Sequence, residues 1–366
     1  MLTPFDDYPV HQTPAPVAQT VSGDPNHYDR YWFNGYDREG AFFLGAAMGH
    51  YPNRGVLDAA FSVLHDGVQH SVFASGRMPV DRATKVGPVR VEVLEPLKTI
   101  RLVVDAGEHG LAADMTFRHR TDAVEEPRQQ LTRNNITVMD YTRLTQWGTW
   151  EGTITLPGGA VIDVRPETTL ATRDRSWGVR PVGEQLATNF PPEMPQLFWL
   201  WAPLHFDDCC THLGLFERAD GVRWVEQALI VPLAGVGEPD HLGRSEVDLR
   251  WMPGTREIES ARIIPHRRDG SALPAIDFER ILTFRMRGIG YLHPRFGHGT
   301  NHGELEVAAE SIEVDDFTPL DPSSIHVQTL CRVRFGDRSG VGVLEQLAFG
   351  PHEPSGLTGL LDGYAG

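Results

Sequence analysis

Apolar residues along this chain occur in short runs separated by turn signals, and few segments show a helical period. The clearest case is residues 56–65 and 68–76, which flank Asp66-Gly67. An Asp-Gly pair between two apolar runs is typical of a β-hairpin, because the tight turn needs a positive φ that glycine adopts at little cost. The same pattern predicts strands at 41–49, 88–95, 99–105, 111–121, 146–156, 160–164, 197–207, 210–218, 222–231, 245–252, 256–266, 276–287, 302–313, 325–335 and 340–350.

Many short strands at this spacing predict an all-β protein of antiparallel barrels or sandwiches with few short helices. The best helix candidates are 123–131 and 354–363. The hairpin turn at Asp66-Gly67 has a counterpart at Asp220-Gly221, and such a repeat suggests duplication, although any two Asp-Gly hairpins look alike. We therefore expect an arm at 1–27, two related domains at 28–188 and 189–366, and a boundary in the Pro-rich segment 189–195.

Composition narrows the function classes. The 366 residues are 40% hydrophobic and carry a net charge of −16, which argues against a nucleic-acid or anionic-membrane surface. Cys209, Cys210 and Cys331 form neither a disulfide framework nor a Cys-x-x-Cys metal motif. The chain contains no apolar run long enough for a membrane helix and no secretory signal pattern, so we expect a cytoplasmic protein. Nucleotide-binding and serine-hydrolase motifs are missing too, so no cofactor is expected.

The strand predicted at 197–207 carries the strongest candidate chemistry. Because side chains alternate between faces, one face holds Trp199, Trp201, His205 and Asp207. A carboxyl beside aromatic walls has a raised pKa, which suits a general acid. The alternative is that Asp207 and Asp208 begin a solvated turn.

Two glutamates stand on strand faces that are otherwise apolar. Glu226 follows Trp224, and Glu345 lies between Val343 and Leu347. A buried carboxylate must be paired or neutral. Each is therefore either half of an internal Glu–Arg pair or an acid that lines a ligand cavity.

Residues 173–180 place three arginines, one acid and a tryptophan in eight positions, with Asp174, Arg175 and Trp177 at their centre. A tryptophan in such a segment indicates partial burial, with arginines that pair with acids or stack on the ring. The segment is either an anchor at a pocket mouth or a plug that closes one end of a barrel.

Three histidines cluster at His293, His298 and His302. A metal site is disfavoured, because the segment is a Gly-rich loop with no fixed face. A loop over a pocket, in which one histidine such as His298 acts in acid–base chemistry, fits better. Ordinary structure is the further alternative.

At Arg173-Asp174-Arg175-Ser176-Trp177-Gly178 the chain resembles the tandem-lipocalin superfamily of carotenoid 1,2-hydratases and AttH-like proteins. The endings at 343–346 and 350–352 also look like a branch of that group. The resemblance implies two lipocalin-type barrels and, in the hydratases, an aspartic acid that protonates a double bond without a cofactor. Arg175 replaces the histidine of the family's Asp-His-x-Trp-Gly motif, and arginine cannot donate a proton at neutral pH. By spacing, Asp207 with His205 then becomes the acid, and Asp174 a second candidate.

These observations support one leading hypothesis and two alternatives. The leading hypothesis is a cofactor-independent hydratase, isomerase or cyclase that acts on an apolar, isoprenoid-like or steroid-like molecule. Its acid would be Asp207, with His205 tuning it. The first alternative is a non-catalytic carrier of a small hydrophobic molecule, and the second is that both barrels are filled and only their junction binds a ligand. A homodimer is compatible with the sequence. The candidate binding residues are Trp177, Trp199, Trp201, Arg175, Glu226, Glu345 and His298.

Overall fold

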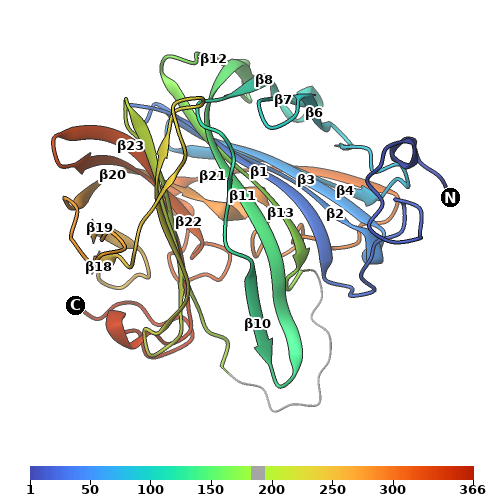
Figure 1. Ribbon diagram of the computed structural model, residues 1–366. Helices are drawn as coiled ribbons and strands as arrows, with labels where there is room; N and C mark the ends of the chain where they lie inside the picture. The colour runs from blue at the N-terminus through green and yellow to red at the C-terminus, as the bar shows by residue number, and fades with distance from the viewer. Residues whose placement is uncertain (183–193) are drawn as a thin grey trace.

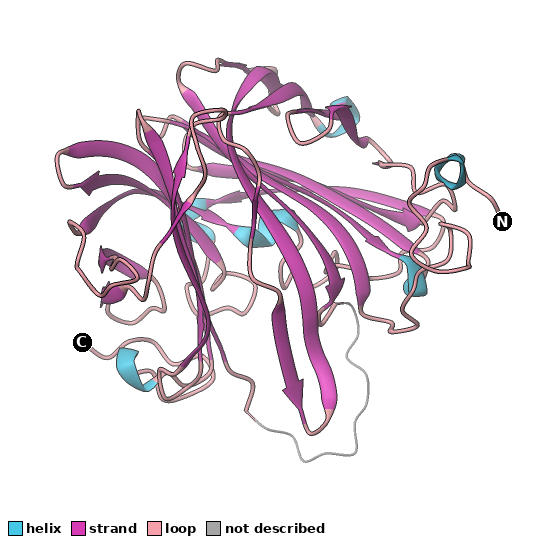
Figure 2. Cartoon of the chain, viewed as in Figure 1, coloured by secondary structure: helices cyan, strands magenta, loops and turns pink. Residues whose placement is uncertain are grey.

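The computed structural model describes residues 1–182 and 194–366 and confirms the all-β prediction. Two antiparallel sheets lie side by side (Figure 1), and loops, turns and short 3₁₀ helices connect their strands (Figure 2). The strands of the first sheet are β1 (His27–Asp37), β2 (Phe42–Tyr51), β3 (Val56–His65), β4 (Val68–Arg77), β5 (Lys85–Val86), β6 (Val89–Glu95), β7 (Thr99–Ala106), β8 (Leu111–His119), β9 (Val124–Glu125), β10 (Gln129–Arg133), β11 (Ile136–Thr155), β12 (Val161–Val164), β13 (Thr169–Val179) and β21 (Leu305–Glu313).

The second sheet consists of β14 (Leu197–His205), β15 (Cys209–Glu217), β16 (Arg223–Pro232), β17 (Asp240–His241), β18 (Glu246–Trp251), β19 (Ile258–Ile264), β20 (Ile276–Arg285), β22 (Val327–Phe335) and β23 (Arg338–Phe349). The 3₁₀ helices are η1 (Pro4–Asp7), η2 (Pro52–Arg54), η3 (Gly107–His109), η4 (Met286–Ile289), η5 (Val314–Asp316) and η6 (Glu353–Ser355). No helix within the described ranges has the length and apolarity that crossing a bilayer requires.

The two sheets share one topology. In each, the first strand of the half lies between the second strand and the last: β1 between β2 and β13, and β14 between β15 and β23. When the sheets are aligned this way, the hairpin β15–β16 at Asp220-Gly221 corresponds to β2–β3. The Asp66-Gly67 turn belongs instead to β3–β4. The two sheets therefore repeat one strand order, but the two Asp-Gly turns are not equivalent positions.

One strand of the second half joins the first sheet. β21 pairs with β4 in an unbroken antiparallel register from Leu305–Gly76 to Glu313–Val68. The preceding helix η4 packs against β2, β3 and β4. The segment 286–313 thus ties the second half to the first, and the boundary expected at 188/189 lies outside the described residues.

Among the described residues, three large apolar clusters and two smaller ones stabilise the molecule. One fills the concave side of each sheet, around Phe61 and Trp150 in the first and around Leu215 and Phe278 in the second. The third lies between the sheets and combines side chains of both halves, including Trp32 and Trp201. The two sheets are therefore joined by a shared core. Its buried aromatic side chains contribute strongly to the stability of this contact.

The predicted helix at 123–131 is wrong. This segment contains β9 and β10, which both pair with β11. β11 itself is twenty residues long and begins ten residues before the strand predicted at 146–156. Pro127 interrupts a helix here, and pairing with the long β11 satisfies the backbone instead. The helix predicted at 354–363 is also wrong, since only η6 is helical there.

Candidate functional site between the two sheets

Strand β13 presents its two sets of side chains to two different environments. Leu170 belongs to the core between the sheets, and Ala171 belongs to the concave core of the first sheet. By the same alternation, Asp174 faces the second sheet, while Arg173 and Arg175 face the concave side. The register agrees, because Asp174 lies opposite Trp32, which is part of the core between the sheets.

Asp174 is a carboxyl group with few partners. Its residue is partly exposed, and within the described ranges no group donates a hydrogen bond to it. Burial raises its pKa to about 6, against the opposing effect of the nearby Arg143 and Arg30 guanidinium groups. A carboxyl with this pKa is populated in both protonation states near neutral pH, as a general acid or base requires.

Glu126 faces the same space but is firmly ionised. It is 3% exposed, forms an ion pair with Arg143, and accepts a hydrogen bond of 2.6 Å from Thr145 Oγ1. Burial acts to raise its pKa, but Arg143 and His212 outweigh that effect and the net shift is downward. Arg143 also stacks on two indoles, with its Cζ 4.8 Å from the ring centre of Trp199 and 5.7 Å from that of Trp201.

Glu345 is the third carboxylate. Its Oε1 lies 2.7 Å from Nε2 of His326, and its Oε2 accepts a hydrogen bond of 2.6 Å from Gln328. Trp199 Nε1 donates a further bond of 3.2 Å. Burial opposes ionisation, but His326 and the other partners hold the pKa of Glu345 below its usual value. Two of the three carboxylates are thus held charged, and Asp174 is the one whose proton is retained longer.

Arg30, from β1, connects this space to the loop that follows η4. Its Nη1 donates a hydrogen bond of 2.8 Å to the Tyr291 hydroxyl, and its Nη2 lies 3.1 Å from Nε2 of His298. Burial, reinforced by Arg30, lowers the pKa of His298 well below the usual value, so the imidazole is neutral. His298 is therefore a neutral group whose Nε2 lies between Arg30 and the Ile289 carbonyl, 3.0 Å from the carbonyl oxygen.

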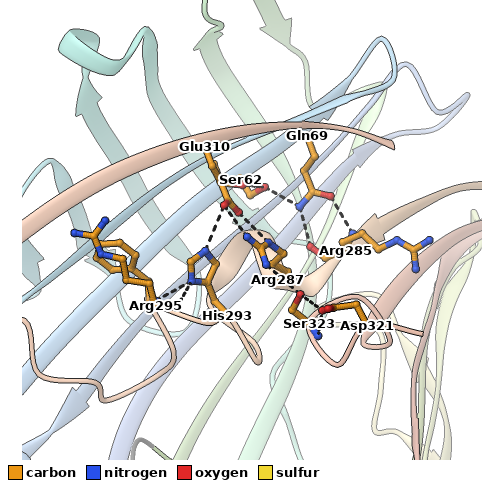
Figure 3. Close-up of polar contacts among 11 residues, drawn as sticks. Ser62, Gln69, Arg285, Arg287, His293, Arg295, Glu310, Asp321 and Ser323 are labelled. Atoms are coloured by element: carbon orange, nitrogen blue, oxygen red, sulfur yellow. Dashed lines mark hydrogen bonds and ion pairs between the residues drawn. The ribbon is translucent and has the colours of Figure 1, made fainter. Parts of the chain in front are cut away.

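A polar network holds that loop in place (Figure 3). Arg287 and His293 both reach Glu310 of β21, at 2.9 Å and 3.4 Å from its Oε2. Gln69 of β4 donates to the Arg285 carbonyl at 2.8 Å and accepts from the Arg285 amide at 3.0 Å. The three histidines of the loop contact different partners, since His302 lies 2.6 Å from Glu306. The loop is thus anchored to the first sheet, which positions Tyr291 and His298.

Several buried side-chain nitrogens in this region have no partner in the described ranges. They come from both halves of the chain, and each lies in a side chain that contacts or faces the space around Asp174: Arg30 Nε, Trp32 Nε1, Arg143 Nε and His326 Nδ1. Buried polar groups are nearly always satisfied by protein, water or ligand. This cluster of unsatisfied groups is consistent with a site that binds a polar group of a ligand.

The structure brings together some of the residues that the sequence singled out and separates others. Asp174, Trp199, Trp201 and Glu345 lie in the region between the sheets, and His298 reaches that region through Arg30. The other five lie elsewhere: Asp207, His205, Glu226, Arg175 and Trp177.

Asp207 does not have the surroundings that its proposed role requires. It is exposed at the turn after β14, where the neighbouring Asp208 pairs with Arg338. His205 is buried beside Arg120, whose Nη1 lies 2.9 Å from its Nδ1, while its Nε2 lies 3.1 Å from the Ala171 carbonyl. Burial lowers the pKa of His205 well below its usual value, so it is a neutral structural group. The solvated-turn alternative describes Asp207 better.

Glu226, Arg175 and Trp177 lie outside the region between the sheets. Glu226 accepts bonds from Arg223 at 2.8 Å and from the Ser245 amide at 2.7 Å, which is the internal Glu–Arg pair of the sequence alternatives. Arg175 pairs with Asp29, and Trp177 is 43% exposed on the opposite face of β13 from Asp174.

Sequence reasoning missed Glu126, Arg143, Arg30, Tyr291 and His326. Glu126 was missed because 123–131 was predicted to be a helix. Arg143 was missed because the strand was predicted to start only at 146. A strict period-two interpretation of 136–155 places Tyr141, Arg143, Thr145 and Trp147 on one face, and these side chains are indeed buried or nearly so. An arginine between aromatic residues on such a face was the available signal.

Gly178 of the motif is required by the backbone. Its φ is +135°, and a Cβ there would lie 2.3 Å from the Asp140 carbonyl oxygen across the β11–β13 ladder. We expect Gly178→Ala to lower the free energy of unfolding by about 1–3 kcal/mol, from strain alone. Urea denaturation would measure this. Gly107→Ala is the matched control, because nothing lies within 4 Å of its Cβ position, and an equal loss in both variants would contradict the explanation.

Solved structures with this fold are known. A crystal structure of an AttH candidate from Nitrosomonas europaea shares 11% identity over 88% of this chain and 92% of its own, with a TM-score of 0.54. Kievitone hydratase from Nectria haematococca shares 12% identity over 87% of this chain and 88% of its own, with a TM-score of 0.53. CghA shares 10% identity over 88% of each chain, with a TM-score of 0.50. At these identities the likeness concerns the fold alone.

The fold is therefore the tandem-lipocalin type that the motif around Trp177 predicted. A search of curated proteins returned no match. The chain belongs to a family of unknown function (DUF8625), whose model matches residues 2–358.

Proposed function

We propose that this protein is a cofactor-independent acid–base enzyme of the hydratase, isomerase or cyclase type, with Asp174 as its proton donor and acceptor. One observation carries the proposal. Of the carboxyl groups Glu126, Asp174 and Glu345, Glu126 and Glu345 are held ionised by Arg and His partners, and Asp174 has a raised pKa, about 6. Asp58, near Arg30, also has its pKa raised to about 6, but it already accepts a hydrogen bond of 2.7 Å from the Gly299 amide. Titratable groups whose pKa values are driven apart in one site mark acid–base assignments.

The chemistry balances without a cofactor. The protonated Asp174 delivers its proton to the substrate, and the resulting carboxylate recovers a proton from attacking water or from a neighbouring C–H bond. Addition of water gives hydration, and loss of a different proton gives an isomer or a ring. Arg143 and Arg30, which lie close enough to affect the Asp174 carboxyl, would stabilise negative charge that develops on a substrate oxygen.

The surroundings favour an apolar molecule that carries an oxygen function. Trp32, Trp199 and Trp201 supply apolar walls, in keeping with an isoprenoid-like or steroid-like body. However, Arg143 already stacks on Trp199 and Trp201, so these rings are less suited to stabilising a bare carbocation. A double bond conjugated with a carbonyl or phenol, whose charge passes to oxygen, fits the two arginines better. The activity for which kievitone hydratase is named, the addition of water, belongs to the same reaction class.

The proposal is tested by incubating the protein with a panel of apolar enones and prenylated phenols in isotopically labelled water. Gain of one labelled water, or of deuterium without a change in composition, identifies hydratase or isomerase chemistry. A ligand that binds and is recovered unlabelled would instead support the carrier hypothesis. A cytoplasmic location and a homodimer stay predictions.

Activity should decrease as pH rises through about 6. The donor must be protonated, and the pKa of Asp174 is about 6, so its acid form is lost above that value. We expect kcat/KM to fall about tenfold per pH unit above pH 7. The pH profile of the reaction found in labelled water measures this, and a profile that rises with pH would contradict Asp174 as the acid.

A further inference from the structure

The N-terminal arm covers a cavity at the end of the first sheet where β1 begins and β2 and β13 end. Arg82 Nη2 donates to the Ala18 carbonyl at 3.3 Å, and Asn53 Nδ2 donates to the carbonyls of Ser22 and Asp24, both at 2.7 Å. Beneath the arm lies a cavity of about 480 Å³. This volume is in the range of ordinary small-molecule sites, which is roughly 300–1,000 Å³.

The cavity wall combines apolar groups with guanidinium groups. Tyr31 and Trp177 contribute rings from the sheet, and Phe5 and Val10 contribute apolar side chains from the arm. Trp177 is 43% exposed and Phe5 is 46% exposed, although both line this cavity. Large apolar side chains left open in a concave wall are typical of a ligand site rather than of a filled core.

The basic groups of this cavity exceed its acids. Arg175 stacks over the Tyr31 ring at 4.0 Å and pairs with Asp29, the one carboxylate in the wall. Arg82 forms no ion pair with any residue in the described ranges, and burial lowers its pKa. His27 and His50 also line the cavity, and burial lowers the pKa of both, so they are mainly neutral at pH 7. Asp29 is therefore shared between two guanidinium groups, and the wall keeps an excess positive charge in a protein whose net charge is −16.

A further cation lies deeper on the same face of β13. Arg173 is 2% exposed, and its Nη2 has no hydrogen-bond partner within the described residues. Its Nε donates to Gln146 at 2.9 Å, and its Cζ lies 5.6 Å from the Phe117 ring. Burial, reinforced by Arg175, lowers the pKa of Arg173 to about 10, so the residue is still charged at neutral pH. Arg173 adds a second positive charge behind the wall.

We propose that this cavity binds an amphipathic organic carboxylate, at a site separate from Asp174. The carboxylate would lie against Arg82 and Arg175, and the apolar chain would lie along Tyr31, Trp177 and the arm. Bidentate geometry and a fixed charge make guanidinium groups well suited to hold a carboxylate. Since the two faces of β13 alternate, one short motif contributes Asp174 to the first site and Arg175 with Trp177 to the second.

Titration of the full-length protein with decanoate, followed by calorimetry, tests this proposal. Decanoate is expected to bind, and decanol or decyltrimethylammonium to bind at least about tenfold more weakly, because a charge-assisted hydrogen bond is lost. Arg82→Gln should weaken decanoate binding by about tenfold or more. Arg118→Gln, which removes an exposed guanidinium paired with Glu151, is the matched control and should bind as the unmodified protein does.

Two further variants locate the ligand. Asp174→Asn should leave decanoate affinity unchanged, since that residue faces the other side of β13. Trp177→Phe is expected to abolish the change in tryptophan fluorescence on decanoate binding while thermal unfolding confirms a folded chain, so the test does not depend on the stability of Arg82→Gln. The proposal is overturned if decanoate does not bind, if decanol binds equally well, or if only Asp174→Asn reduces the affinity.

Discussion

Asp174→Asn is expected to reduce turnover by about 10²–10⁴-fold, the usual contribution of a positioned general acid. The amide keeps the shape of the side chain but has no proton to transfer. Turnover is measured on the substrate identified in labelled water. Asp207→Asn is the matched control: Asp207 is exposed, so its variant should keep full activity. Full turnover by Asp174→Asn would contradict Asp174 as the acid. Loss of turnover in Asp207→Asn would favour Asp207 instead.

The same substitution should make the protein more stable at neutral pH. Burial raises the pKa of Asp174 from 3.8 to about 6, so the folded state favours the protonated form. The stability that this group contributes is complete below its unfolded pKa and is lost as pH rises through 6. Asparagine stays neutral, so the variant should gain about 1–3 kcal/mol at pH 7.5 and little at pH 4.

Denaturant unfolding of both proteins at the two pH values measures this difference. If Asp174 is catalytic and destabilises the fold, the Asp174→Asn variant should be less active but more stable than the unmodified protein. If Asp174 only supports the fold, the activity and the stability of the variant should decrease together. An Asp174→Asn protein that is less stable at pH 7.5 would therefore contradict the proposed role.

Glu126→Ala is expected to lower the free energy of unfolding by about 3–5 kcal/mol. Glu126 is 3% exposed and pairs with Arg143, whose side chain is 11% exposed, so the substitution leaves a buried guanidinium without its carboxylate. It also removes the acceptor of Thr145 and of Trp201. The loss is measured by urea denaturation.

Glu151→Ala is the matched control for this substitution. Glu151 pairs with Arg118 in the same sheet, but their side chains are 39% and 56% exposed. Such a pair contributes about 0–1 kcal/mol. Similar losses in the two variants would show that the buried position of Glu126 has no special effect. A double variant with Arg143→Met should recover part of the loss, because the uncompensated charge is then absent.

The strands could be predicted from the sequence wherever turn residues such as Asp-Gly mark their ends. The hairpin at Asp66-Gly67 is confirmed, with β3 and β4 ending at His65 and beginning at Val68. The prediction was wrong at 123–131, where β9 and β10 are short and gain their stability from pairing with β11. Tertiary pairing overrides local preference in such segments.

The motif around Trp177 was also predictable in part: its strand alternation follows from the sequence, but its surroundings do not. Alternation correctly implies that Asp174 and Arg175 lie on opposite faces of a strand. It does not say which face meets the second sheet and which meets the arm. Choosing Asp207 as the acid followed from spacing, but the turn at Asp207 leads away from the aromatic face into solvent.

By itself, the sequence determined the all-β class, most strand positions, the tandem-lipocalin likeness and the motif that contains Asp174. Only the tertiary structure decided that Asp174 has a raised pKa. The groups that set its pKa, Arg30, Glu126, Arg143 and Glu345, come from four separate strands or loops of both halves. A pKa depends on burial and on charges in space, and these are determined only when the sheets pack together.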